Sequence, residues 1–454
     1  MLHPAEILPP EIIREIFKTF AAPVRLHMPQ TFPWYLGHIC ASWRTIFKSM
    51  ASQFWSRVDI DLHIMNEFHN DPESLYARYA VMLRMLQYFL NHTRGQPFSF
   101  QLKTRFHCLD RESKCIDRLL DMLVEHSPCW QDVYIMFSES RSHLPILYKA
   151  KGHLPLLHSL QLIKGTYDNE PDHIYDFFEN APRLKWLYLG NLSCWRINWS
   201  SLTILKIGEF INDEILLSIL AQTQHLEKLA IYQSLDEASS LDQMTGLLNF
   251  PYLEVLTVIG FKLLSVIEAP ILEELYIEDF DEMNMPHTIV TSFLIRSSCS
   301  LKRLGMAGCS AASLTDILRC APNLVHLNLD NNNDLVMSFG QLTFYRQRRD
   351  KMPPACHLRS ITIMDPGLSD IEIMELSSLL ASRIKDTKDD SGIILVHRLQ
   401  KLSIITLDPL AQYKKRTAVE SMRQQCVGHG VDFVIQQILE ISWPHHDNTS
   451  ILDW

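Results

Sequence analysis

Glycine is scarce in this chain, with only 15 of 454 residues. The glycine-rich and metal-binding motifs of common enzymes are absent, since no GxGxxG, GxxxxGK(S/T), HExxH or GxSxG pattern occurs. The piece Gly428-His429-Gly430 is better explained as a turn before a strand than as a nucleotide-binding loop. These absences predict a chain that is not an enzyme and that uses no cofactor.

An excess of basic residues is also lacking. Lys and Arg total 42 and Asp and Glu total 52, which leaves a net charge of −10. A nucleic-acid binder needs basic surface to neutralise phosphates, so no nucleic-acid partner is expected. The basic runs at 346–351 and 414–416 are read as solvated loop or helix faces.

Paired cysteines and long apolar runs are missing as well. The ten cysteines include no CxxC pair, and the first residues show no basic segment followed by an apolar one. No uncharged apolar run reaches the roughly 18 residues of a membrane span. We therefore expect free thiols, no membrane partner and a cytoplasmic and/or nuclear location. His445-His446-Asp447 could ligate a metal, but adjacent histidines in a tail are usually solvated, so no metal is predicted.

The first sixty residues carry three apolar patterns separated by prolines. Residues 8–17 contain Pro9 and Pro10, which suit the start of a helix, and then place apolar residues at helical spacing. Residues 34–47 repeat that spacing after Pro23, Pro29 and Pro33. Residues 54–62 then change to the alternation of a strand. A small helical domain that leads into a strand is predicted.

These three blocks, LPPEII, then PWYLGHICASWR, then QFWSRV, resemble the F-box, most closely the version found in large fungal families. The resemblance covers roughly residues 4–60 and implies docking on the Skp-family adaptor of SCF-type cullin–RING ligases. The connection at 18–33 departs from the family by lacking its Leu-Asp-Pro turn. The alternative is a generic helical domain with tryptophans in its core. The positions that match the family's adaptor-binding residues are Leu8, Pro9, Ile12, Ile13, Ile16, Ile39, Cys40, Trp43 and Trp55.

From residue 130 onward the pattern apolar-x-x-apolar-x-apolar recurs at intervals averaging roughly 27 residues, within the leucine-rich-repeat range. Its anchors are Trp130, Leu157, Leu184, Leu202, Leu226, Leu253, Leu272, Leu301, Leu324, Leu358 and Leu399. Helical stretches are predicted between the strands at 172–180, 213–221, 314–320 and 369–383, and near the end at 413–427 before a strand at 431–435. Stacked units of this kind form a solenoid.

The predicted fold is therefore an α+β or α/β solenoid, with a helical F-box before an irregular leucine-rich-repeat horseshoe. The expected domains are 1–62 for the F-box and 63–129 for linking helices and a degenerate first repeat. Residues 130–442 form the solenoid, and 443–454 form a C-terminal tail.

Side chains alternate along a strand, so positions three, five and seven of each repeat should face away from the helices. Exposed aromatic residues there would be candidate anchors for a protein partner. The acidic residues Glu274, Glu278, Asp279 and Asp281 suggest a basic partner segment, although a solvated acidic rim is equally compatible. The aromatic residues could instead pack against one another or against a tail. The candidate substrate-binding residues are Trp186, Tyr188, Tyr232, Glu274, Tyr276 and Glu278.

Together these features predict the substrate-recognition subunit of a ubiquitin ligase, with the adaptor and cullin core as partners and an unknown target protein. A non-degradative interaction scaffold built on the repeats is the alternative.

Overall fold

The protein is described by a computed structural model. It describes residues 8–19, 23–28, 33–50, 54–62, 72–104, 110–137, 144–164, 175–191, 195–209, 213–233, 246–278, 287–307, 311–330, 342–343, 355–364, 370–383, 387–388, 394–406 and 416–437. The expected tail at 443–454 lies outside these residues.

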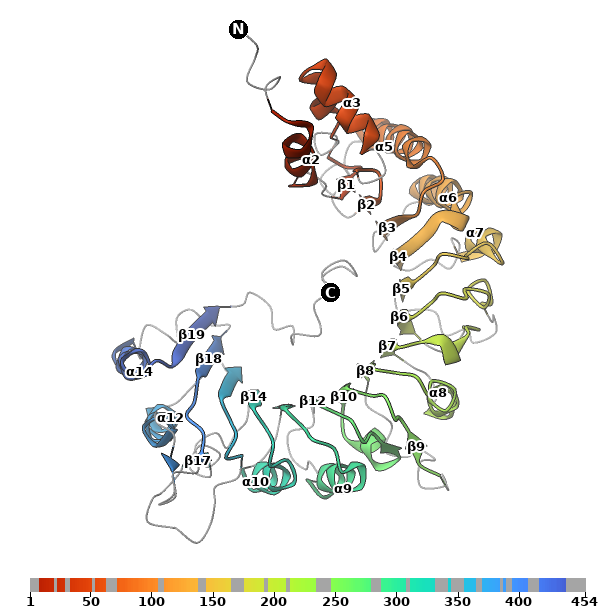
Figure 1. Ribbon diagram of the computed structural model, residues 1–454. Helices are drawn as coiled ribbons and strands as arrows, with labels where there is room; N and C mark the ends of the chain where they lie inside the picture. Colours follow the sequence, from red (N-terminus) through yellow and green to blue (C-terminus); the bar gives the residue numbers. More distant parts are fainter. Residues whose placement is uncertain are drawn as a thin grey trace. The chain divides into compact units, whose positions relative to one another are not determined.

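A long all-parallel sheet of fifteen strands, with helices between the strands, dominates the fold (Figure 1). Its strand order follows the chain, β1-β2-β3-β4-β5-β6-β7-β8-β10-β12-β13-β14-β15-β18-β19. A parallel sheet whose strands are added in chain order is what a repeat solenoid builds, because each repeat contacts mainly its neighbours. The chain divides into two compact units, residues 1–211 with 449–454 and residues 212–448.

The first unit contains seven strands of this sheet. Its elements are α2 (Pro10–Thr19), β1 (Val24–Arg25), η2 (Pro33–His38), α3 (Ala41–Ser49), β2 (Arg57–Asp61), α5 (Pro72–Thr93), β3 (Phe98–Lys103), α6 (Asp110–Val124), η4 (Ser127–Cys129), β4 (Trp130–Phe137), α7 (Leu144–Leu147), η6 (Tyr148–Ala150), β5 (Ser159–Lys164), β6 (Trp186–Asn191), η7 (Trp199–Ser201) and β7 (Ile204–Glu209). We call α2, η2 and α3 the helical module.

The second unit continues the same alternation of strand and helix. Its elements are α8 (Asp213–Leu220), β8 (Lys228–Ile231), β9 (Leu248–Asn249), β10 (Val255–Ile259), η9 (Lys262–Ser265), β11 (Ile267–Glu268), β12 (Glu274–Glu278), α9 (His287–Ser297), β13 (Arg303–Ala307), α10 (Ala311–Cys320), β14 (His326–Asp330), β15 (Ser360–Met364), α12 (Asp370–Arg383), β16 (Thr387–Lys388), β17 (Ile394–Val396), β18 (Lys401–Thr406), α14 (Arg416–Gly428) and β19 (Asp432–Gln437).

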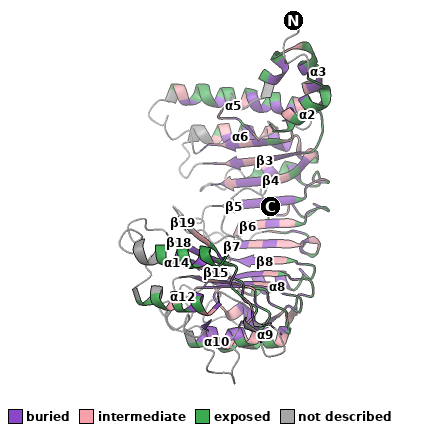
Figure 2. Ribbon diagram, turned by 60° about the vertical axis from the view of Figure 1, so that its left-hand side comes forward, coloured by how far each residue is buried: buried purple, intermediate pink, exposed green. Residues whose placement is uncertain are grey.

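The repeat anchors are confirmed as core residues. All eleven are at most 1% exposed, and each lies at or just before a strand of the sheet. The core lies between the strands and the helices, and buried residues run along both (Figure 2). We call the helix-covered side of the sheet the outer face and the opposite side the inner face.

Most predicted helices are present, and one is not. The stretches at 213–221, 314–320 and 369–383 form α8, α10 and α12, and α14 with β19 closes the described chain. The helix expected at 172–180 is wrong for its described part, since residues 175–180 form a bridge and a turn. Tyr175 pairs with Trp195 through that isolated bridge, and the ring of Phe177 packs 5.5 Å from that of Trp195. Tertiary packing of aromatic rings here overrides the local helical spacing.

The sheet begins well before the first repeat anchor at residue 130. Strand β1 lies in the proline-rich connection of the helical module and pairs with β2, which pairs with β3. A row of aromatic rings joins these first strands to the repeats. The distances between ring centroids are 6.0 Å for Trp55–Phe89, 5.9 Å for Phe89–Phe98, 6.2 Å for Phe98–Phe100 and 5.0 Å for Phe100–Trp130. The helical module is therefore joined to the sheet and is not a separate domain.

Candidate interaction surfaces

The core of the helical module is aromatic. Ile13 and Phe17 lie one turn apart on α2 and are buried, as i and i+4 residues share one helix face. The Phe17 ring contacts Trp43 of α3 at 5.1 Å and Phe54 at 5.9 Å between centroids, both edge-on. Trp43 is only 8% exposed. Edge-to-face packing of this kind fixes the angle between the two helices.

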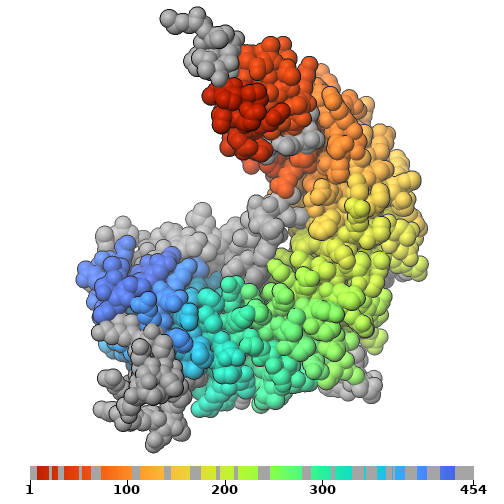
Figure 3. Space-filling view, in the orientation of Figure 1, coloured from red at the N-terminus to blue at the C-terminus, as the bar shows by residue number. Residues whose placement is uncertain are grey.

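Three large apolar side chains of the module and its borders are open to solvent. Leu8 is 37% exposed, Ile12 48% and Ile39 46%. Pro9 is also exposed, and Ile16 and Cys40 are half-buried. We call Leu8, Ile12 and Ile39 the exposed apolar set. Ile12 lies in α2, Leu8 lies just before α2, and Ile39 lies between η2 and α3, in the N-terminal part of the chain drawn in red in Figure 3. Burying one such side chain on a partner contributes about 1.5–3 kcal/mol, so the set suits protein contact.

The structure thus divides the nine adaptor-binding candidates. Ile13, Trp43 and Trp55 were expected to contact a partner, but their side chains are buried within the chain. Trp55 packs at 5.5 Å from Tyr88 and 6.0 Å from Phe89 of α5, measured between centroids. Trp55 therefore packs against α5, the first helix that covers the outer face of the sheet. The other six candidates keep exposed or half-exposed surface.

The pairing of the strands agrees with the repeat positions that were predicted to face away from the helices. In the first unit, Asp132, Ser159, Trp186 and Ile204 are consecutive partners at position three. In the second unit, position three runs from Lys228 through Val255, Glu274 and Arg303 to His326. The predicted alignment of position three from strand to strand is confirmed for these strands. Tightly stacked neighbours, however, cover much of one another's surface.

Trp186 and Tyr188 are brought together on the inner face of β6. Both are half-buried, and Tyr188 pairs in register with Lys206 of β7. The ammonium nitrogen of Lys206 is 6.0 Å from the centroid of the Trp186 indole, within cation–π range. These two rings remain accessible in part and stay candidates for a partner surface.

The candidates on β12 are less accessible than expected. Tyr276 is 5% exposed and Glu278 is 2% exposed, so the expectation that they form an open binding surface is wrong. Tyr276 clusters with the buried Met364, and Val255, Ala307 and Ile405 pack against this pair. Burial raises the pKa of the Tyr276 hydroxyl to about 12, so it stays protonated and donates to Glu274 Oε2 at 3.2 Å.

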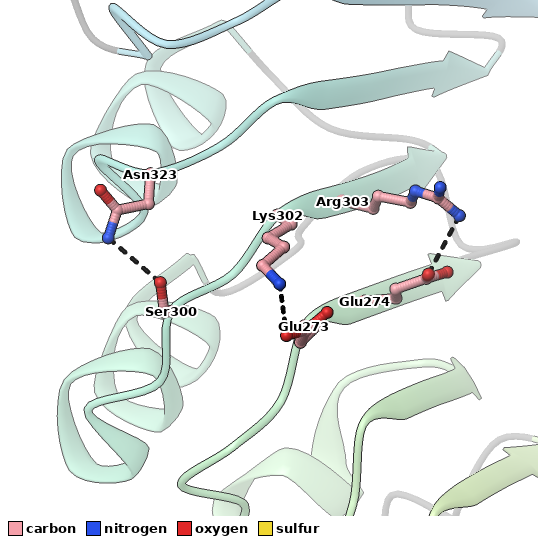
Figure 4. A network of polar contacts seen from close by, with 6 residues as sticks. All are labelled: Glu273, Glu274, Ser300, Lys302, Arg303 and Asn323. Carbon is pink, nitrogen blue, oxygen red and sulfur yellow. Dashed lines mark hydrogen bonds and ion pairs between the residues drawn. The ribbon is translucent and has the colours of Figure 1, made fainter.

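Glu274 is also committed within the chain. The Arg303 Nη1 atom donates to Glu274 Oε1 at 3.0 Å, as Figure 4 shows. Beside this pair, the Lys302 ammonium pairs with Glu273, and Asn323 Nδ2 donates to Ser300 Oγ at 3.1 Å. These contacts link successive repeats, so the carboxylate of Glu274 stabilises the pairing of β12 with β13. Tyr232 is half-buried just after β8, while Asp279 and Asp281 lie outside the described residues.

A polar cavity lies on the inner face of β1 to β4. Its volume is about 140 Å³. Its lining residues are Pro23, Arg25, Arg57, Val58, Asp59, Ser99, Phe100, Gln101, Asp132 and Tyr134. We call it the β1–β4 cavity. Asp132 and Tyr134 occupy positions three and five of the repeat that begins at Trp130. Sequence reasoning missed the other lining residues, because the repeat pattern was followed only from residue 130 onward.

The two acids of this cavity differ in their partners. Ser99 Oγ donates to Asp132 Oδ2 at 2.9 Å. Asp59 Oδ2 is 4.0 Å from Arg25 Nε, while its Oδ1 atom is buried and has no hydrogen-bond partner among the described residues. Burial, with a contribution from Asp61, raises the pKa of the Asp59 carboxyl above its usual value. A buried acceptor without a donor costs free energy, so this carboxyl is the least satisfied group of the site.

Metal and membrane features were also sought in the described ranges. Within them, no group of three or more His, Cys, Asp or Glu side chains could hold a metal ion, and no helix is long and apolar enough to cross a membrane. His445, His446 and Asp447 lie outside those ranges.

Comparison with known proteins adds no name to these surfaces. No family model matches the chain, and no curated protein matches its sequence. The arrangement of strands and helices shows an α/β protein, and its long parallel sheet is consistent with a leucine-rich-repeat-like solenoid.

Proposed function

We propose that this chain is a substrate receptor of an SCF-type cullin–RING ubiquitin ligase. In this proposal the helical module is an F-box that docks the Skp-family adaptor, and the inner face of the sheet binds the target protein. The receptor contributes proximity between the target and the ubiquitin-charged enzyme, while bond-making belongs to other subunits. The non-degradative scaffold differs in that a captured partner is not ubiquitinated.

The observation that supports this proposal is the exposed apolar set on the helical module. Leu8, Ile12 and Ile39 fall at positions where the F-box resemblance expects adaptor contacts, and each is more than a third exposed. Ile13, Phe17 and Trp43 of the same module are buried within the chain. Exposed apolar side chains on a small, already packed module are typical of a docking surface.

The test is adaptor binding by the full chain carrying Ile12→Asp and Ile39→Asp together. Two charges placed where apolar contacts are expected should weaken adaptor binding by about 100-fold or more, since each lost contact contributes about 1.5–3 kcal/mol. Affinity is measured by biolayer interferometry with purified adaptor. Trp43→Ala is a poorer choice, because Trp43 is buried and its loss would disturb the fold.

The matched control is Ile295→Asp on α9, which is 67% exposed and lies in the second unit. It should bind the adaptor as the unmodified chain does. Equal affinity of the double variant, or no adaptor binding by the unmodified chain, would contradict the docking assignment. Ubiquitination of a captured target in a reconstituted ligase then separates the receptor from a scaffold.

A further inference from the structure

The ladder of the sheet is interrupted beside the β1–β4 cavity. Phe98 pairs with Trp130, whereas Phe100 pairs with Val133, so two residues of β4 stand opposite Ser99 alone. Such a bulge bends the strand and leaves a residue out of the ladder, and bulges occur often at functional sites. Here the bulge includes Asp132, one of the two acids of the cavity.

The cavity walls come from two inner columns in register. Arg25, Asp59, Gln101 and Tyr134 are successive strand partners in one column, and Arg57 pairs with Ser99 in the other. Their side chains therefore project from the same face of four neighbouring strands. A site made by strands rather than loops holds its groups in defined positions.

The acids lie deeper in this cavity than the arginines. The side chain of Asp59 is 23% exposed and that of Asp132 is 18% exposed, whereas that of Arg25 is 53% exposed. The buried Oδ1 atom of Asp59 is an acceptor, and an anionic ligand could not satisfy it. The interior therefore favours a ligand that donates hydrogen bonds and carries positive charge.

The volume of the cavity and the aromatic ring of Tyr134 restrict the class of ligand further. About 140 Å³ is close to the roughly 150 Å³ cavity that holds a benzene molecule, so the space fits one side chain and not a whole cofactor. Tyr134 forms one wall and is 4% exposed. Its ring already has the Lys103 ammonium 5.8 Å from its centroid, which shows that this wall is compatible with a cation.

We propose that the β1–β4 cavity binds the basic side chain, arginine or lysine, of a partner protein, with Asp59 and Asp132 as the acceptors. The Asp59 carboxylate meets the guanidinium or ammonium group, and Tyr134 packs along its stem. This site goes beyond the proposed function and does not depend on adaptor docking, because all of its residues lie on or next to the first four strands. It assigns part of the inner face to recognition of a basic segment.

The experiment uses the full chain and small probes in saturation-transfer NMR at millimolar concentration. N-acetyl-arginine amide and N-acetyl-lysine amide should show transfer, while the neutral isostere N-acetyl-citrulline amide should show much less. Asp59→Asn should lower the affinity for the basic probes about tenfold or more, since it removes a charged hydrogen-bond acceptor. Asp132→Asn provides a second variant with the same expectation. Both variants are checked for unchanged circular dichroism.

The control is Asp121→Asn, which removes the same charge from α6, where Asp121 pairs with Lys149 at 2.5 Å. It should leave probe binding unchanged. Citrulline amide binding as tightly as arginine amide, or basic-probe binding that survives both cavity substitutions, would overturn the proposal. Binding of inorganic phosphate that is lost in Arg57→Ala would also overturn it, because the cavity would then be an anion site. None of these outcomes involves the adaptor.

Discussion

The inner faces of the two units share one strand pattern, but two of their acidic residues differ in how their carboxylates are satisfied. In the second unit the Glu274 carboxylate of β12 is satisfied by neighbours, because it pairs with Arg303 and accepts a hydrogen bond from Tyr276. In the first unit the Asp59 carboxyl has a buried oxygen without a described partner. A buried polar network that is complete stabilises a sheet, whereas an incomplete one offers a place for a ligand. This difference supports the proposal that the first four strands hold a recognition site.

The cores of the two units differ as well. The first unit is packed through aromatic rings, with Trp55, Phe98 and Trp130 all buried. In the second unit a fully buried arginine takes a structural role. Arg383 donates from Nε and Nη2 to the Leu342 carbonyl at 3.1 and 3.0 Å, and from Nη1 to the Ala355 carbonyl at 3.1 Å. Burial lowers the pKa of its guanidinium to about 10, which still leaves it charged at neutral pH.

The largest effect is expected from Trp55→Ala in the first unit. Removing this buried tryptophan leaves a cavity beside α5, and such changes cost about 3–5 kcal/mol. The free energy of unfolding of the full chain is measured by urea denaturation. Tyr252→Ala, at a residue 52% exposed, is the control and should cost under about 1 kcal/mol. Similar losses in the free energy of unfolding for Trp55→Ala and Tyr252→Ala would contradict the expected difference between buried and exposed aromatic residues.

A smaller loss, about 2–4 kcal/mol, is expected from Arg383→Ala in the second unit. The substitution leaves the Leu342 and Ala355 carbonyls buried without this donor, and an unmet buried acceptor costs about 1–3 kcal/mol. The loss for Arg383→Lys should lie between those of Arg383→Ala and the unmodified chain, because one ammonium group cannot reproduce the several hydrogen bonds of the planar guanidinium. The control Arg319→Ala removes an exposed arginine paired only with Asp316 in the same helix. If Arg383→Ala unfolds at the same urea midpoint as the control variant, the assignment of a structural role to this arginine is wrong.

The smallest effect is a gain in stability from Asp59→Asn. Because the pKa of this carboxyl is raised in the folded chain, the folded state holds the proton more tightly than the unfolded state. Its contribution is therefore most favourable below the ordinary aspartate pKa, and it is lost as the pH rises through the folded value. Asp59→Asn should raise the melting temperature by a few degrees at pH 7 and by much less near pH 3.

Differential scanning calorimetry at both pH values measures this effect, with Asp121→Asn as the control. A lower melting temperature for Asp59→Asn at pH 7 would show that the carboxylate is satisfied in the fold. The contrast between the two inner faces would then disappear.

Much of the scaffold could be predicted from spacing. The apolar anchors and the inner columns follow from the short period of a strand and the longer period of the repeat, and both are visible in one chain. Strand β1 could not be predicted, since Val24 and Arg25 lie in a proline-rich connection and form a strand only because β2 pairs with them. The burial of Trp55 against α5 depends likewise on contacts distant in the sequence.

The sequence by itself determined which residues could form the core and which face of each strand they would occupy, because alternation and repeat length are local properties. Only the tertiary structure decided which polar groups on the inner face are satisfied. Glu274 and Asp59 are both acids in inner columns, yet one meets an arginine on the next strand and the other keeps a buried oxygen without a described donor. That outcome depends on register, on the bulge at β4 and on neighbours brought together by stacking, none of which spacing alone reveals.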